Sequence, residues 1–202
     1  MKLLLRRALD ETEFLSAYGV RSLSKYHAEN PFVFSSSAME YRVYHEAGEP
    51  TSNRFGGNSY WRGPVWMPVD YLLIDSLYEF HRYYGNDFKV EFPVGSRRRV
   101  TLVEVADELR NRLASLYLGG EDGRRPSLGT SQLLQVDPNF RDHLFFHEYY
   151  HAETGAGLGA SHQTGWSGLI ALLLHPRDPD DPGNLSKNDP AGSRSLASPP
   201  LT

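Results

Sequence analysis

Two long stretches of helix-periodic apolar residues set most of what this 202-residue chain can fold into. Between residues 64 and 84 the apolar side chains follow helical spacing, and Gly85 then supplies a stop. A second apolar stripe runs over 101–117, where Thr101 and Glu104 have the spacing of a capping box. The pattern predicts two amphipathic helices that must bury their apolar faces against each other or against further elements.

Shorter patterns suggest the remaining organisation. We expect a short helix within 2–17, a strand at 38–45 and a final helix at 164–174, joined by long loops of the kind that are usually functional. This arrangement favours an all-α fold over a domain of residues 1–174. Residues 175–202 are rich in Pro, Ser and Asp, and such a segment buries too little apolar surface to order itself, so we predict a disordered tail.

Composition argues against several classes of function. A net charge of −4 disfavours a nucleic-acid partner, because phosphate binding depends on clustered Lys and Arg. The chain has no cysteine, which excludes disulfides and thiolate chemistry. No apolar run approaches the roughly 20 residues of a membrane helix, and the opening leucines are too few for a signal peptide. We therefore expect no membrane partner and a cytoplasmic location.

The first chemically rich motif occupies residues 55–66. Its glycines permit tight turns, and Tyr60, Trp61 and Trp66 offer flat faces suited to the C–H surface of a pyranose ring. Arg62 could donate hydrogen bonds to sugar hydroxyls. The same pattern equally fits a loop that core tryptophans anchor ahead of a helix.

The second motif spans residues 145–166 and places acidic residues and histidines in a glycine-rich segment. His147, Glu148 and His151 have the order of a zinc-binding motif, but that motif needs an uninterrupted helix, which the following glycines would soon break. The glycines of 155–159 could form a phosphate loop, although no apolar strand precedes them and no Lys follows. A purely structural turn also remains open.

Both motifs resemble glycoside hydrolase family 63, which includes processing α-glucosidases and bacterial glucosylglycerate and mannosylglycerate hydrolases. The residues that carry the resemblance are Tyr-Trp-Arg-Gly-Pro-Val-Trp at 60–66 and the run from Glu148 to Trp166. The similarity extends over about 18–174. It implies a partial (α/α)6 barrel, an inverting mechanism, a carbohydrate substrate, and neither a cofactor nor a catalytic metal, which weighs against the zinc hypothesis.

The resemblance also implies roles for individual residues. Glu148 matches the general base, which takes a proton from the attacking water. Trp61 and Trp66 match aromatic walls of the sugar subsite, while Tyr60 and Gln163 match side chains that contact substrate. Three neighbours could support the site from behind: Arg62, His162 and Trp166.

Two departures from the family pattern qualify these roles. Ala152-Glu153 stands where Gly-Asp or Gly-Asn is expected. The family's general acid is an Asp farther upstream than the 147 residues that precede Glu148, so we expect the acid to lie outside this chain. An inverting α-glucosidase-like hydrolase would then need the missing N-terminal part of the barrel as its partner, and the isolated chain should be inactive. The alternative is a catalytically inactive carbohydrate-binding remnant.

Overall fold

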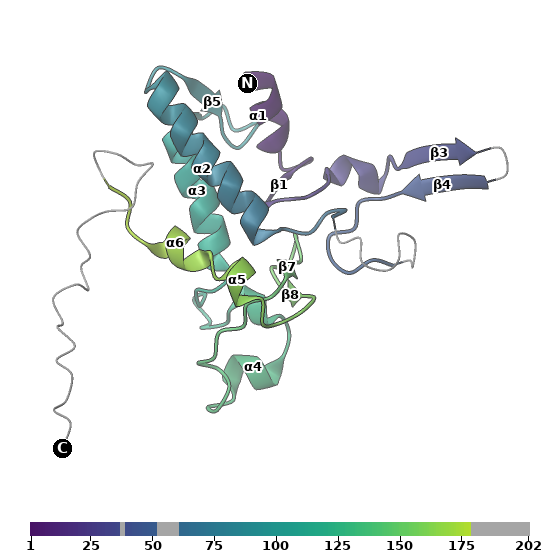
Figure 1. Cartoon of the computed structure of the whole chain (residues 1–202), viewed down its shortest axis with the longest axis vertical. Coiled ribbons are helices and arrows are strands. Elements are labelled where there is room, and N and C mark those ends of the chain that lie inside the picture. The colour runs from purple at the N-terminus through teal and green to yellow at the C-terminus, as the bar shows by residue number, and fades with distance from the viewer. Residues whose placement is uncertain (37–38, 52–60, 179–202) are drawn as a thin grey trace.

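The computed structural model describes residues 1–36, 39–51 and 61–178 (Figure 1). Its centre is a pair of helices, α2 (Met67–Tyr84) and α3 (Leu102–Ser115), which pack side by side. They are the two helices longer than ten residues in the described part of the chain. This pair confirms the two helices that the apolar periodicity predicts.

The ends of this helix pair follow the local sequence signals. The Thr101 hydroxyl accepts the Glu104 N–H, and the Glu104 carboxylate accepts the Thr101 N–H in return, so the predicted capping box is present. Gly85 follows α2 with a φ of 66°, a conformation that favours glycine. The helix begins at Met67 rather than at residue 64, because Val65 is held extended by pairing with Tyr150.

The apolar core fills the space between α2, α3 and the segments that pack on them. The N-terminal helix α1 (Lys2–Ala8) and the C-terminal helix α6 (Ile170–Leu174) each contribute buried leucine or isoleucine side chains. The largest fully buried aliphatic side chains of this core are Leu9, Leu15, Met67, Ile74, Leu77, Leu102, Leu109 and Leu113. Burial of this set, at about 25 cal/mol per Å² of apolar surface, is the main favourable contribution to folding.

The prediction of an all-α fold is wrong. The described residues also form four two-stranded antiparallel sheets, so the chain mixes helix and strand. The strands pair as β1 (Leu15–Ser16) with β2 (Gly19–Val20), β3 (Phe32–Ser36) with β4 (Met39–Val43), β5 (Lys89–Glu91) with β6 (Arg99–Thr101), and β7 (Tyr149–Tyr150) with β8 (Gly157–Leu158). Each sheet joins two segments that are close in sequence. Runs this short between turn residues pair their backbone N–H and C=O groups more readily in a hairpin than in a helix, because helix nucleation is costly.

The shorter predicted elements are partly correct. The helix expected within 2–17 ends at residue 8, because the chain then turns into β1. The strand expected at 38–45 corresponds to β4. The helix expected at 164–174 is interrupted: α5 (Thr164–Ser167) stops at Gly168, and α6 follows after a short break. The remaining helical turns are η1 (Lys25–Ala28), η3 (Pro126–Leu128) and α4 (Gln132–Val136).

The C-terminal segment is described only as far as residue 178. The rest of the predicted tail, 179–202, lies outside the described residues. Among the helices that the structure describes, none combines the length and apolar character needed to cross a membrane.

Candidate active site

The two motifs meet in space although they are far apart in the sequence. The Val65 N–H donates to the Tyr150 carbonyl, and the Tyr150 N–H donates to the Val65 carbonyl, both at 2.9 Å. On its other side Val65 forms a bridge with Arg21. The end of the first motif, at Val65, therefore pairs with β7, which follows Glu148 directly.

Glu148 lies half-buried at the start of the β7–β8 hairpin. Its N–H donates to the Ala160 carbonyl at 2.9 Å, and its Oε2 accepts the Ala160 N–H at 3.3 Å. Gly159 has a φ of +67°, and a Cβ there would lie 2.7 Å from the same Oε2. Glycine at 159 thus lets the carboxylate fold against the backbone that returns from β8. This role explains one of the three glycines of 155–159 without a phosphate ligand.

Aromatic rings are stacked beside the hairpin. Trp66 is only 4% exposed and lies between Trp61, at a centroid distance of 3.8 Å and nearly parallel, and Tyr149, at 4.9 Å. Trp166 meets Trp66 edge-on at 6.2 Å. Trp61 remains 48% exposed on the outside of the stack. Of the two proposed sugar walls, Trp61 presents an open face, whereas Trp66 is the buried anchor that holds Trp61 in place.

Gln163 and His162 lie on the segment that pairs with Phe146, two residues before Glu148. The Gln163 N–H donates to the Phe146 carbonyl at 2.8 Å, and its own carbonyl accepts the Trp166 N–H at 2.9 Å at the start of α5. His162 bridges Phe146 in parallel register. Both the Gln163 and the His162 residues are exposed. The backbone pairing therefore brings Gln163 near Glu148 while leaving it accessible to a ligand.

Arg62 ties the described end of the first motif to Glu46. Its guanidinium forms an ion pair with Glu46 at 2.5 Å, and both side chains are nearly buried. The Glu46 carboxylate also accepts the Thr51 N–H at 2.9 Å, and the Glu46 N–H donates to the Arg62 carbonyl at 2.7 Å. These contacts fit the supporting role proposed for Arg62. Tyr60 lies outside the described residues.

The zinc hypothesis requires a helix that this segment does not form. Residues 146–150 are a bridge followed by a strand, so His147 and His151 are not one helical turn apart. The His147 ring instead covers Gly157, where a Cβ would lie 2.1 Å from the ring. Burial lowers the pKa of His147, and the neighbouring His162 lowers it further. Across the described part of the chain, no group of three or more His, Asp or Glu residues is arranged to hold a metal ion.

The turn between β7 and β8 is shaped by His151. Its Nδ1 accepts the N–H groups of Glu153 and Thr154 at 3.2 and 3.3 Å. The ring also packs against Gly48, where a Cβ would lie 2.4 Å away. His151 therefore stabilises the turn that follows the strand of the proposed base.

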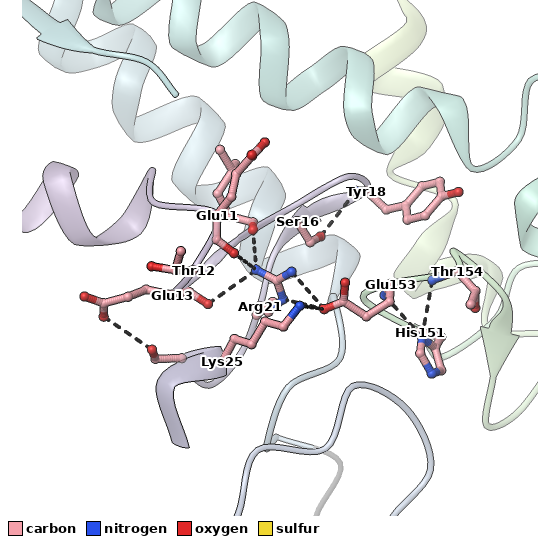
Figure 2. A network of polar contacts seen from close by, with 12 residues as sticks. Glu11, Thr12, Glu13, Ser16, Tyr18, Arg21, Lys25, His151, Glu153 and Thr154 are labelled. Atoms are coloured by element: carbon pink, nitrogen blue, oxygen red, sulfur yellow. Dashed lines mark hydrogen bonds and ion pairs between the residues drawn. The ribbon is translucent and has the colours of Figure 1, made fainter. Parts of the chain in front are cut away.

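A buried arginine ties the same turn to the N-terminal segment, as Figure 2 shows. The Arg21 side chain is 3% exposed, and its guanidinium donates to the Glu153 carboxylate at 2.8 Å, with the Lys25 ammonium at 3.5 Å from the same oxygen. Arg21 also donates to the carbonyl groups of Glu11, Glu13 and Leu15. Burial opposes ionisation of Glu153, but Arg21 outweighs it and holds the pKa of Glu153 below its ordinary value.

The sequence analysis gave Arg21 and Glu153 no role. The available signal was the acidic residue at 153, where the family pattern has Asp or Asn after Gly. Two open clefts, of about 650 and 660 Å³, border this turn, one lined by Arg21 and Glu153 and the other by Tyr18 and Thr154. Neither is lined by Glu148. The proposed base therefore lies on a surface of the described chain rather than within these clefts.

Comparison with known proteins identifies the family. A model described as the mannosylglycerate hydrolase MGH1-like glycoside hydrolase domain matches residues 1–167. The chain belongs to this glycoside hydrolase family. The match and the relatives below confirm the predicted relation to glycoside hydrolase family 63.

Three relatives show how much of a family member this chain represents. An uncharacterized protein of Saccharomyces cerevisiae is 52% identical over 173 residues, which is 85% of this chain and 16% of that protein. A probable mannosyl-oligosaccharide glucosidase of Schizosaccharomyces pombe is 26% identical over 171 residues, covering 85% of this chain and 15% of that protein. Alpha-glucosidase 2 of Arabidopsis thaliana is 27% identical over 164 residues, covering 81% and 15%. The chain thus spans less than a fifth of the length of these relatives.

Proposed function

We propose that this chain carries the general-base portion of an active site that hydrolyses α-linked glucosides. The observation that carries the proposal is the pairing of Val65 with Tyr150, which brings the aromatic motif beside the strand that follows Glu148. The names of the relatives, a probable mannosyl-oligosaccharide glucosidase and an alpha-glucosidase, support glucose as the sugar.

In this proposal Glu148 acts on water. Its ionised carboxylate accepts a proton as the water oxygen attacks the anomeric carbon from the face opposite the leaving group. The glycosidic C–O bond breaks, and a second, protonated carboxyl group about 6.5–9.5 Å away donates a proton to the leaving oxygen. The anomeric configuration inverts. The second carboxyl group comes from outside this chain, and the rest of a longer glycoside hydrolase is the partner that supplies it.

Two further residues hold the sugar. The open face of Trp61, fixed by its stack on Trp66, can pack against the C–H surface of a pyranose ring. Gln163 is exposed and its backbone pairs with Phe146, two residues before Glu148, and its side-chain amide can both donate to and accept from hydroxyl groups. Trp61 therefore fixes the plane of the sugar ring, and Gln163 fixes the rotation of the sugar within that plane.

The test measures hydrolysis of aryl α-glucosides and α-mannosides by this chain co-expressed with the remainder of the 52% identical Saccharomyces protein. We expect Glu148→Gln to lower kcat by about 10²–10⁴-fold, the usual contribution of a general base. Azide should partly restore turnover in Glu148→Ala, and NMR should detect the inverted anomer first. Glu121→Gln, at an exposed loop position, is the matched control and should keep full activity. Full activity in Glu148→Gln would contradict the assignment.

A carbohydrate-binding remnant is the second candidate, and the half-exposed Trp61 favours it. In that case sugar quenches the tryptophan fluorescence of the chain, and Trp61→Ala abolishes the quenching, while no combination with a longer partner hydrolyses any glycoside. Turnover that depends on Glu148 contradicts this second candidate.

A further inference from the structure

The β3–β4 hairpin projects from the rest of the molecule (Figure 1). Its strands pair Phe32 with Val43, Phe34 with Tyr41 and Ser36 with Met39. Directly opposed residues share a face of an antiparallel pair, and the face alternates along each strand. One face of this hairpin, here called the apolar hairpin face, is therefore formed by Phe32, Phe34, Met39, Tyr41 and Val43.

The opposite face of the hairpin is mainly polar. It carries Val33, Ser35, Glu40 and Arg42, and the last two form an ion pair at 2.7 Å. A two-sided pattern of this kind normally turns its apolar side toward a core. Here the apolar side is open, since Phe32 and Met39 are each 60% exposed and Phe34 is 55% exposed.

Such a face is unfavourable in water on two counts. Contiguous exposed apolar side chains on a soluble protein mark interaction sites, because their hydration is costly. A two-stranded hairpin by itself is also only marginally stable, and it usually needs packing against another element. The alternation along both strands shows a surface shaped for a covering layer on one side only.

We infer that the apolar hairpin face docks against the polypeptide that completes the glycoside hydrolase, a partner presenting aliphatic and aromatic side chains. This inference rests on the proposed function for the identity of the partner. Phe32 and Phe34 have no side-chain donor or acceptor, and the Tyr41 hydroxyl of this face donates to the Met39 sulfur at 3.9 Å, so the face offers few groups to match sugar hydroxyls and a carbohydrate is a poor occupant. The match covers 16% and 15% of two relatives, so each of them has much further polypeptide that could cover this face.

The experiment uses the Saccharomyces relative without its matched segment as the probe, co-expressed with this full chain carrying an affinity tag. We expect co-purification with the wild type. Phe34→Ser and Met39→Ser should each weaken the complex by at least about tenfold, as truncation of a buried interface anchor does. Val33→Ser is the matched control, because it changes an exposed apolar residue on the polar face of the same hairpin. It should bind like the wild type.

Several outcomes would overturn the inference. They are failure of the wild type to co-purify, retention of full affinity by both apolar-face variants, or equal loss in Val33→Ser. A chain that is dimeric alone by light scattering, and monomeric as Phe34→Ser, would identify a second copy as the occupant instead. A complex that forms through this face but hydrolyses no glycoside would refute the proposed function and leave the docking intact. Hydrolysis that survives both apolar-face variants would refute the docking and leave the proposed function intact.

Discussion

Replacing Gly157 by alanine isolates one close contact within the proposed active site. A Cβ at this position would lie 2.1 Å from Cδ2 of the His147 ring and 2.3 Å from Cγ, far inside contact distance. The ring is half-buried, so relief requires a shift of the ring or of the hairpin. Overpacking of this kind costs about 1–3 kcal/mol. For a domain of this size we expect Tm to fall by about 2–12 °C.

Gly165→Ala is the matched control for this experiment. Gly165 lies in the same motif and in α5, but a Cβ there would meet no atom within 4 Å. Alanine is also more favourable than glycine in a helix by up to about 1 kcal/mol, so Gly165→Ala should equal or slightly exceed the wild type in stability.

Thermal unfolding followed by circular dichroism provides the assay, with a double-mutant cycle to assign the cause. His147→Ala removes the ring that the new methyl group of Gly157→Ala would strike, so the two changes together should cost less than the sum of the single changes. A Gly157→Ala protein as stable as the wild type would refute the reasoning, as would a strictly additive double variant.

Three further predictions concern buried polar and aromatic groups. Burial raises the pKa of Asp70 well above 3.8, although the Val20 N–H donates to its carboxylate. The folded chain therefore binds more protons than the unfolded chain above pH 3.8, and its stability falls as pH rises toward the pKa of Asp70 in the folded state. Asp70→Asn should raise Tm at pH 8 and change it little at pH 4. Burial lowers the pKa of His45 from 6.5 to about 4. Between these two pH values the unfolded chain binds more protons than the folded chain, so stability falls as pH drops from 6.5 to 4. His45→Gln should flatten the dependence of Tm on pH in this range. Trp66→Ala should cost about 3–5 kcal/mol in urea unfolding, whereas Trp61→Ala should cost about 1 kcal/mol, because only Trp66 is enclosed.

Sequence reasoning was reliable where a local signal sufficed. The capping box at Thr101 and the stop at Gly85 place the ends of helices within a residue or two, because each satisfies backbone groups of its own turn. The start of α2 was less accurate. There the competing partner for the backbone of Val65 is Tyr150, and no local pattern encodes a contact at such separation.

In the proposed site, too, the sequence indicated which residues take part but not the arrangement that distant contacts impose on them. The family resemblance gave Trp61 and Trp66 the same role as walls of a sugar subsite, and in the structure their rings stack on each other. Which of the two remains open to a ligand depends on Tyr149 and Trp166, which cover Trp66 from other directions. The sequence also could not reveal that Arg21 reaches Glu153, because an ion pair between residues so far apart in the chain follows from tertiary packing alone.

The Val65–Tyr150 pairing has a consequence for the order of folding. The β7–β8 hairpin closes over a few residues and can form early, but the strand at Val65 joins it only after the intervening chain has collapsed into the α2–α3 pair. Closing so long a loop costs entropy that only the finished core offsets, and contacts of this separation form slowly. The aromatic stack and the carboxylate therefore come together among the last events of folding. Peptides that contain either motif alone will not assemble the surface on which Glu148 lies.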